Sequence, residues 1–208
     1  LIYDRVNSHP SMMADRAYAP EPDFKPEFLY GVESKRALKD SDGVGFSLQY
    51  ELSYPTVLKM LEMGGITVRN DKRRDDEPII LAGGPCTFNP LPLAEFIDVF
   101  CIGDGEEMMV DVCEVLEKTI GLPRKERISE LCKLKGCWSA GTNQTVGKRI
   151  APLTLEYAAT SYPIPFSSSV HDRAIVEIRR GCGRMCRFCQ PGHVTLPIRE
   201  GSAEDIIK

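Results

Sequence analysis

The chain has 208 residues, with 26 lysines and arginines against 30 aspartates and glutamates and a formal net charge of −4. This length is ample for a buried core, and a pI near 5.5 excludes a protein whose main task is to coat nucleic acid. No apolar run is long enough to span a bilayer, and the start carries no signal-type stretch. We therefore predict a cytoplasmic protein with no membrane partner.

Residues 40–118 alternate short apolar runs with longer amphipathic ones, a pattern that predicts βα units and a mainly parallel sheet. The fold class is therefore α/β, with an open sheet. A charged run over residues 70–77 predicts a solvent-exposed loop. We expect strands at 43–48, 78–82 and 99–102, and helices at 54–63, 92–96 and 106–118.

The ends of the chain and a drop in regularity suggest the domain limits. The first residues resemble the middle of a helix without a cap, and the last ones lie in a helix-like run, so we interpret the chain as an internal fragment. We predict an α/β domain over residues 1–120 and an interdomain segment, interrupted by glycine and proline, over 121–166. A second domain over 167–208 begins with a strand at 174–178.

Small residues stand at the end of the first predicted strand and directly after the next two. They are Ser47, Gly83, Gly84 and Gly103. In open α/β sheets the carboxyl ends of the strands meet at one edge, where ligands bind, and glycine there permits a close approach to the backbone. Tight turns explain such glycines equally well.

Eight cysteines are present, and thiols in the cytoplasm are kept reduced, so clustered cysteines favour metal binding over disulfides. Cys182, Cys186 and Cys189 form the pattern Cys-x3-Cys-x2-Cys, with Phe188 directly before the last cysteine. Three thiolates on one loop suit an iron–sulfur cluster or zinc. In a cubane cluster they would leave one iron open to a small chelating molecule.

Zinc is the alternative, because His193 follows Cys189 and a Cys3His set is a closed zinc site. Such a site would make the chain a zinc-stabilised module that binds RNA or protein. The short spacings, the apolar strand before the loop and Phe188 favour the cluster. Four arginines surround the loop, at positions 179, 180, 184 and 187. Their positive charge could offset the charge of a cluster or attract an anionic substrate such as RNA. A solvent-exposed loop explains them equally well.

The cysteine spacing with Phe188 resembles the signature of the radical S-adenosylmethionine (SAM) superfamily. The resemblance implies that Cys182, Cys186 and Cys189 hold a 4Fe-4S cluster, that SAM chelates the fourth iron and that the backbone at Phe188 contacts the adenine. It further implies reductive cleavage of SAM to a 5′-deoxyadenosyl radical that acts on a substrate, with an electron donor such as flavodoxin or ferredoxin.

Further segments are similar to an uncharacterised bacterial family of B12-binding-domain radical SAM proteins. These segments are residues 45–52, 82–86, 102–107 and 170–182. The resemblance implies a Rossmann-like, cobalamin-binding-type domain followed by the start of a partial (β/α) barrel. It would place cobalamin at Ser47, Gly83, Gly84 and Gly103, although the Asp-x-His-x-x-Gly motif that supplies an axial histidine is not found in the sequence. The sequence identifies neither the reaction type, nor the substrate, nor a catalytic residue beyond the cofactor ligands.

Overall fold

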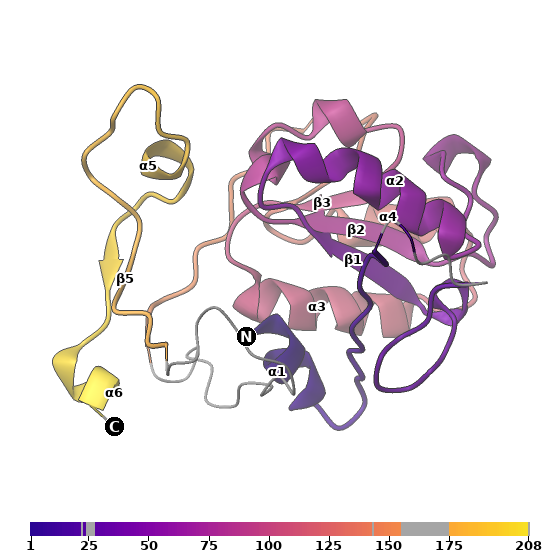
Figure 1. Ribbon diagram of the computed structural model, residues 1–208, viewed down its shortest axis with the longest axis horizontal. Helices are drawn as coiled ribbons and strands as arrows, with labels where there is room; N and C mark the ends of the chain where they lie inside the picture. Colours follow the sequence, from indigo (N-terminus) through magenta and orange to yellow (C-terminus); the bar gives the residue numbers. More distant parts are fainter. Residues whose placement is uncertain (22, 24–27, 143, 155–174, 208) are drawn as a thin grey trace.

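The computed structural model describes residues 1–21, 23, 28–142, 144–154 and 175–207 (Figure 1). Its helices and strands follow in chain order: α1 (Ile2–Asn7), β1 (Gly43–Ser47), α2 (Tyr54–Met63), β2 (Ile79–Gly83), β3 (Val99–Cys101), α3 (Gly105–Lys118), α4 (Arg124–Leu131), β4 (Cys137–Trp138), β5 (Arg179–Arg180), α5 (Pro191–Val194), β6 (Arg199–Glu200) and α6 (Ala203–Ile207). Within these ranges no helix is both long and apolar enough to cross a membrane.

One four-stranded sheet organises the first part of the chain. Its strand order is β1-β2-β3-β4, with β1, β2 and β3 parallel and β4 antiparallel to β3. Helix α2 covers one face of this sheet, while α3 and α1 lie against the other (Figure 1). This arrangement confirms the predicted α/β class with a mostly parallel sheet; the Rossmann-like detail stays a prediction.

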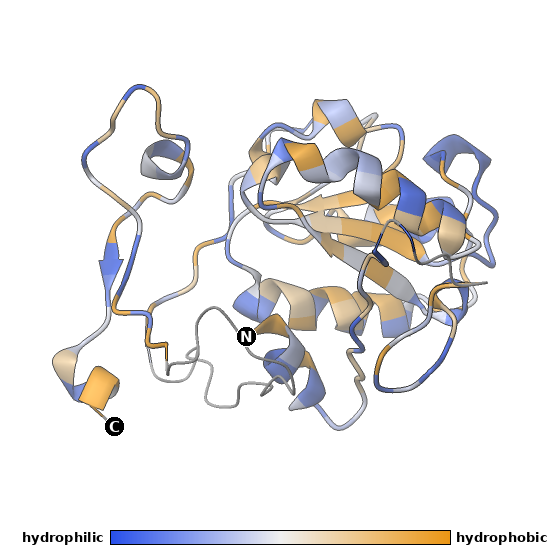
Figure 2. Ribbon diagram, viewed as in Figure 1, coloured by the Kyte–Doolittle hydropathy of each residue, from blue (hydrophilic) through white to orange (hydrophobic). Residues whose placement is uncertain are grey.

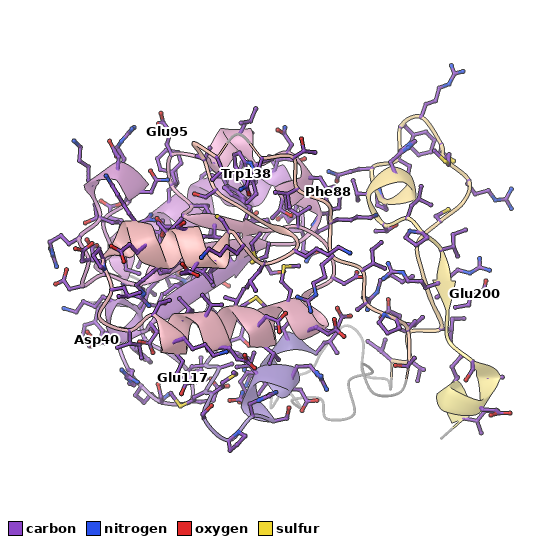
Figure 3. All side chains as sticks on the ribbon, turned by 180° about the vertical axis from the view of Figure 1, so that it is seen from behind. Asp40, Phe88, Glu95, Glu117, Trp138 and Glu200 are labelled. Atoms are coloured by element: carbon purple, nitrogen blue, oxygen red, sulfur yellow. The ribbon has the colours of Figure 1, made fainter. Side chains whose placement is uncertain are left out.

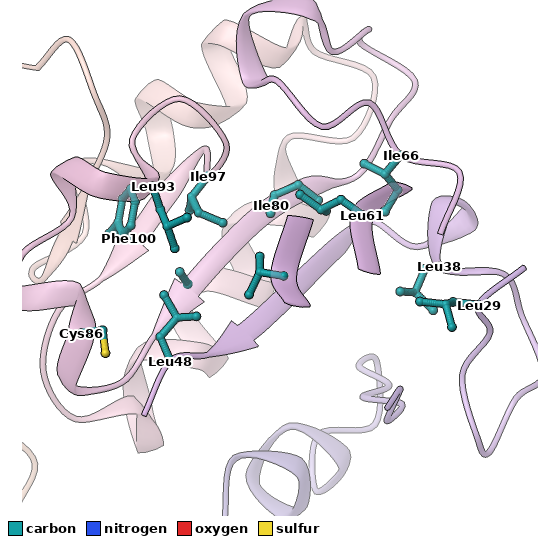
Figure 4. Close-up of a cluster of buried hydrophobic side chains, with 12 residues drawn as sticks. Leu29, Leu38, Leu48, Leu61, Ile66, Ile80, Cys86, Leu93, Ile97 and Phe100 are labelled. Carbon is teal, nitrogen blue, oxygen red and sulfur yellow. The ribbon is translucent and has the colours of Figure 1, made fainter. Parts of the chain in front are cut away.

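The face of the sheet under α2 is apolar because alternate strand residues point to it. Ile80 and Phe100 are at most 1% exposed and pack with Leu61 of α2 (Figure 4). Helix α2 begins and ends at the residues that the sequence predicts, with Pro55 in its first turn, where the missing amide costs nothing, and Gly64 directly after it.

The opposite face carries the other alternate residues, among them Ile79, Leu81 and Val99. Met108, Val112 and Leu116 of α3 pack on this face, and all three are buried. The apolar strands are therefore enclosed between two helical layers (Figure 2).

Two expectations within this half are wrong in detail. The predicted helix over 92–96 is a 3₁₀ turn over Leu91–Leu93, and the carbonyl groups of residues 94–96 that follow it accept hydrogen bonds from Asn70 and Arg73. The charged run over 70–77 is not wholly solvated, because Arg73 and Glu77 are only 7% and 5% exposed. Arg73 forms an ion pair with the buried Asp98 at the start of β3, 2.9 Å away.

Two regular elements lie within residues 121–166, where we expected an interdomain segment. Helix α4 packs against α3, and β4 extends the sheet with its Cys137 opposite Cys101. The predicted start of the second domain at residue 167 lies outside the described residues, so the domain limits stay predictions.

The strand predicted over 174–178 is not present in its described part, residues 175–178. Instead, β5 follows directly and pairs antiparallel with β6, Arg179 opposite Glu200. A strand needs a hydrogen-bonding neighbour, and β6 lies alongside residues 179–180 only. The (β/α) barrel is therefore not confirmed and stays a prediction.

Candidate functional site

A cavity of about 680 Å³ lies at the carboxyl ends of the parallel strands. Ser47, Gly83, Gly84 and Gly103 all line it, so the structure brings together the four residues that the sequence analysis placed at this edge. Helix α1, helix α3 and the segment after the cysteine loop close its sides. The volume falls within the range of about 300–1,000 Å³ that is typical of small-molecule sites.

The glycines at this edge fall into two groups. A Cβ added to Gly84 would lie 2.6 Å from the Leu48 carbonyl oxygen, and one added to Gly103 would overlap the Arg149 carbonyl. Both residues also have φ values in the left-handed region, +99° and +115°. Their conformation and tight backbone packing explain why they are glycines, without any ligand.

Gly83 and Gly45 are different, because their backbone angles suit any residue. A Cβ on Gly83 would come no nearer than 4.0 Å to another atom, and a Cβ on Gly45 would meet nothing within 4 Å. Both line the cavity and face the α3 side of the sheet, as Ser47 does. The sequence analysis missed Gly45, although a glycine inside a strand is itself a signal of close approach.

Asp104, the residue directly before α3, links three segments of the chain. Its carboxylate accepts hydrogen bonds from the Ala151 amide at 2.8 Å and from the Arg199 guanidinium. It also lies 3.1 Å from Nη1 of Arg180. Burial alone would raise the pKa of Asp104, but the Ala151 amide, Arg199 and Arg180 together hold it below its ordinary value.

Arg180, two residues before the first loop cysteine, is held by three carboxylates. Its Nη1 lies 2.6 Å from Glu106 Oε1, and its Nη2 lies 2.6 Å from Glu177 Oε2; Asp104 is the third. The hydrogen bond with Glu177, followed by the charge of Glu106, raises the pKa of Arg180. The base of the cysteine loop is therefore fixed to the edge of the sheet.

Lys148 gives the cavity a cation of a different kind. Its ammonium donates to the Val194 carbonyl at 2.7 Å and to the Leu196 carbonyl, and lies 5.7 Å from the centre of the Phe88 ring. In the described part of the chain no carboxylate forms an ion pair with it. Partial burial, assisted by the charge of Arg199, lowers the pKa of Lys148.

The cysteine loop stands beside this edge of the sheet, joined to it through α5. Helix α5 contacts the 3₁₀ turn Pro85–Phe88, and Gln190 Nε2 lies 3.5 Å from the Pro85 carbonyl oxygen. Val194 and Thr195 line the cavity, while none of the three cysteines does. Figure 3 shows Phe88 on the side of the α/β half that faces the segment carrying Glu200.

The three loop cysteines are free thiols; Cys182 and Cys186 are exposed and Cys189 is half-buried. The donor set fits an iron–sulfur cluster in number and softness. Among the described residues, however, no three Cys, His, Asp or Glu side chains are gathered as a metal would gather them. Metal binding would therefore have to draw the thiols together, as is usual where binding and folding are coupled.

The other predicted loop residues are all on the surface or paired. The Phe188 side chain is 91% exposed, and Arg184 and Arg187 are also exposed. Arg179 pairs with Glu200 on the surface. His193 Nε2 lies 3.2 Å from the Cys186 carbonyl oxygen, so this ring nitrogen faces backbone and not the thiols.

Of the remaining five cysteines, three are buried and the other two are half-buried: Cys86, Cys101 and Cys137, and Cys113 and Cys132. Cys101 and Cys137 are cross-strand partners, 5% and 0% exposed. Their mutual hydrogen bond, together with burial, raises the pKa of the Cys101 thiol. The same hydrogen bond lowers the pKa of Cys137, so it is the Cys101 thiol that resists ionisation.

No histidine is among the described residues that line the cavity. A corrin bound there would therefore lack an axial imidazole from these residues. We derive no step through cobalamin, and its binding stays a prediction.

A mostly parallel sheet with a cavity at the carboxyl ends of its strands, joined to a loop of three free thiols, defines the chain as an α/β protein. The family model described as "Radical SAM proteins, N-terminal" matches residues 1–139, from α1 through β4. The match covers more than half of the chain, which belongs to this family of radical SAM proteins.

A relative in Methanocaldococcus jannaschii is similar to most of the chain. This uncharacterised protein is 28% identical over 184 residues, which cover 86% of the present chain and 36% of the relative. The chain therefore spans about a third of the length of that protein.

Proposed function

We propose that the chain is part of a radical SAM enzyme in which Cys182, Cys186 and Cys189 hold a 4Fe-4S cluster. The observation that carries the proposal is the loop of three free, solvent-accessible thiols in a chain of the radical SAM family. Three protein ligands leave one iron open, and SAM would bind there through its amino and carboxylate groups. When reduced, such a cluster supplies the electron that splits SAM into methionine and a 5′-deoxyadenosyl radical.

The contribution of this chain's own residues is to orient the loop. Arg180 fixes the base of the loop to Asp104 and Glu106, and α5 holds its far end against Pro85–Phe88. Because both ends of the loop are attached to the rim of the cavity, a substrate in the cavity would lie near the cluster. The backbone at Phe188, the residue between two ligand positions, would contact the SAM adenine.

A zinc-stabilised module with a Cys3His site is the second candidate function. A zinc site would need His193, whose Nε2 now faces the Cys186 carbonyl at 3.2 Å. No specific contact favours RNA or a protein partner, since Arg179 and Arg180 are both engaged in ion pairs. We propose an electron donor such as flavodoxin or ferredoxin as the partner of the enzyme.

Anaerobic reconstitution with iron and sulfide tests the ligand assignment. We expect about four irons per chain in the wild type and near-complete loss of iron in a Cys182→Ala/Cys186→Ala/Cys189→Ala variant. A Cys86→Ala/Cys113→Ala/Cys132→Ala variant removes as many thiols elsewhere and should keep its iron. Equal iron in the wild type and in the loop variant would refute the assignment.

Metal analysis of protein purified without oxygen distinguishes the iron–sulfur cluster from the zinc module. If the three cysteines hold a cluster, the protein contains iron, and the His193→Ala variant retains it. Stoichiometric zinc that disappears in His193→Ala would instead establish the zinc module.

A further inference from the structure

Two strand positions on the floor of the cavity lack a side chain, at the place where α3 no longer covers the sheet. Gly43, nearer the start of β1, would bring a Cβ within 3.0 Å of Leu116 of α3, so that position is covered. Two residues further along, Gly45 faces open space, and so does Gly83 at the end of β2. The free space therefore begins where the cover of α3 ends.

Folding gives no reason for glycine at these two positions. Glycine inside a strand costs about 0.5–1 kcal/mol of stability relative to alanine. Neither residue has a φ value in the left-handed region, and no backbone segment approaches Gly45. Close approach by a ligand is a recognised cause of a strand glycine, and it fits the open space over these two positions.

The walls of the cavity are mainly apolar. Five of the lining residues have apolar side chains and come from distant parts of the sequence: Phe88, Met108, Met109, Ile150 and Val194. A ligand that lies on the bare backbone of β1 and β2 would therefore meet apolar side chains around its edge. This environment suits a flat ring system, which can contact the strands over its whole face.

Of the cationic side chains that line the cavity, Lys148 is the one that forms no ion pair in the described chain, although the charge of Asp104 also acts on it. Arg180 and Arg199 are bound by Asp104, and Arg149 by Glu107 and Asp111. In the described chain the Lys148 ammonium donates hydrogen bonds to the Val194 and Leu196 carbonyls and lies over the Phe88 ring. A half-buried ammonium beside an apolar cavity is best matched by an anion.

We propose that the cavity binds a flat, largely apolar molecule with one anionic group, the ring lying over Gly45 and Gly83 and the anionic group meeting Lys148. As the substrate class of the enzyme, this inference rests on the proposed function. Binding itself requires no cluster, and it is measured on the cluster-free full chain. Failure of cluster assembly would therefore leave this proposal standing, and failure of binding would leave the cluster assignment standing.

Two fluorescent probes with the same ring system separate the two parts of the proposal. Anilinonaphthalene sulfonate carries one anionic group, and N-phenylnaphthylamine carries none. Both should bind the wild type, the sulfonate more tightly. Gly45→Val adds a side chain that strands favour and should weaken both probes by on the order of tenfold or more. Gly147→Val is the matched control, because Gly147 also faces open space but does not line the cavity.

Lys148→Met tests the anionic group. It should weaken the sulfonate probe by about tenfold and leave the neutral probe unchanged. Lys148→Arg should restore sulfonate binding, and the exposed Lys135→Met should change neither probe. Equal losses for both probes in Lys148→Met would overturn the role of Lys148.

The cavity itself is tested at two positions. If Gly45→Val unfolds, as judged by its thermal transition, Gly83→Val replaces it, since its Cβ would also meet open space. Unchanged binding of both probes in a folded variant at either glycine would overturn the proposal.

Discussion

Arg180 and Glu106 form an ion pair of 2.6 Å that joins the base of the cysteine loop to the first turn of α3. The Glu106 side chain is 3% exposed and that of Arg180 is 18% exposed. The pair therefore lies in an environment where water screens it little, and each charge depends on its partner.

Arg180→Met should lower the free energy of unfolding by about 2–3 kcal/mol, because it leaves the buried Glu106 without its cation. Arg180→Lys should recover part of this loss, since one ammonium cannot serve three carboxylates in the way that a guanidinium does. Urea unfolding monitored by circular dichroism measures both variants. The exposed Arg179→Met serves as the control and should change stability by less than about 1 kcal/mol. A loss of equal size in Arg180→Met and Arg179→Met would contradict the anchoring role of Arg180.

Asp98 is the second buried charge on which the sheet depends. It is bound by Arg73 and Arg124, and it accepts the Ile80 amide at 2.6 Å. Asp98→Asn would leave two buried guanidinium groups without a counter-charge, and we expect a loss of about 3–5 kcal/mol in urea unfolding. Asp76→Asn breaks an ion pair whose side chains are both 70% exposed, and it should cost less than about 1 kcal/mol. Stability in Asp98→Asn close to that of the wild type would contradict the importance of this cluster.

The carboxylate of Asp104 should make stability depend on pH. Its pKa lies below 3.8, the ordinary value, so its ionised form stabilises the fold above that pH, and this stabilisation is lost as pH falls through the folded-state pKa. The stability difference between the wild type and Asp104→Asn should therefore be constant near neutral pH and shrink below about pH 4. Urea unfolding of both proteins across this range measures the difference. A difference that stays constant down to about pH 2 would show that Asp104 does not titrate as its contacts require.

The accessibility of the thiols predicts an order of alkylation. Cys182 and Cys186 are exposed, whereas Cys101 and Cys137 are buried and hydrogen-bonded to each other. Iodoacetamide should therefore modify the two loop cysteines in the native protein and reach the buried pair only after unfolding. Peptide mass spectrometry identifies the modified sites. Early labelling of Cys101 or Cys137 would contradict the buried placement of β3 and β4.

The sequence predicts the elements that neighbouring residues determine, and it misses those that depend on contacts between distant parts of the chain. Helix α2 has an amphipathic pattern, a proline at its start and a glycine after its end, and its bounds are predicted correctly. Helix α4 was missed, because its sequence offers few apolar residues, and its position depends on packing against α3. A helix is predicted where the structure has a 3₁₀ turn at Leu91–Leu93, because the hydrogen bonds of the next residues with Asn70 and Arg73 join distant parts of the chain.

The candidate site also has one part that a local sequence pattern predicts and another part that only the fold brings together. The cysteine loop is a local pattern, and spacing alone identifies it. The sequence does not predict the contacts of Asp104 with Arg180 and Arg199, because these residues are brought together only by the fold. Nor does it separate Gly84 and Gly103, which pack against backbone, from Gly45 and Gly83, which border open space.

The most direct test of the cluster assignment is electron paramagnetic resonance of the reconstituted, dithionite-reduced chain, recorded with and without SAM. Ligation by Cys182, Cys186 and Cys189 leaves one iron open, so we predict a reduced-cluster signal whose shape changes when SAM is added. An iron–sulfur signal that SAM does not alter, or that persists in the Cys182→Ala/Cys186→Ala/Cys189→Ala variant, would contradict the account.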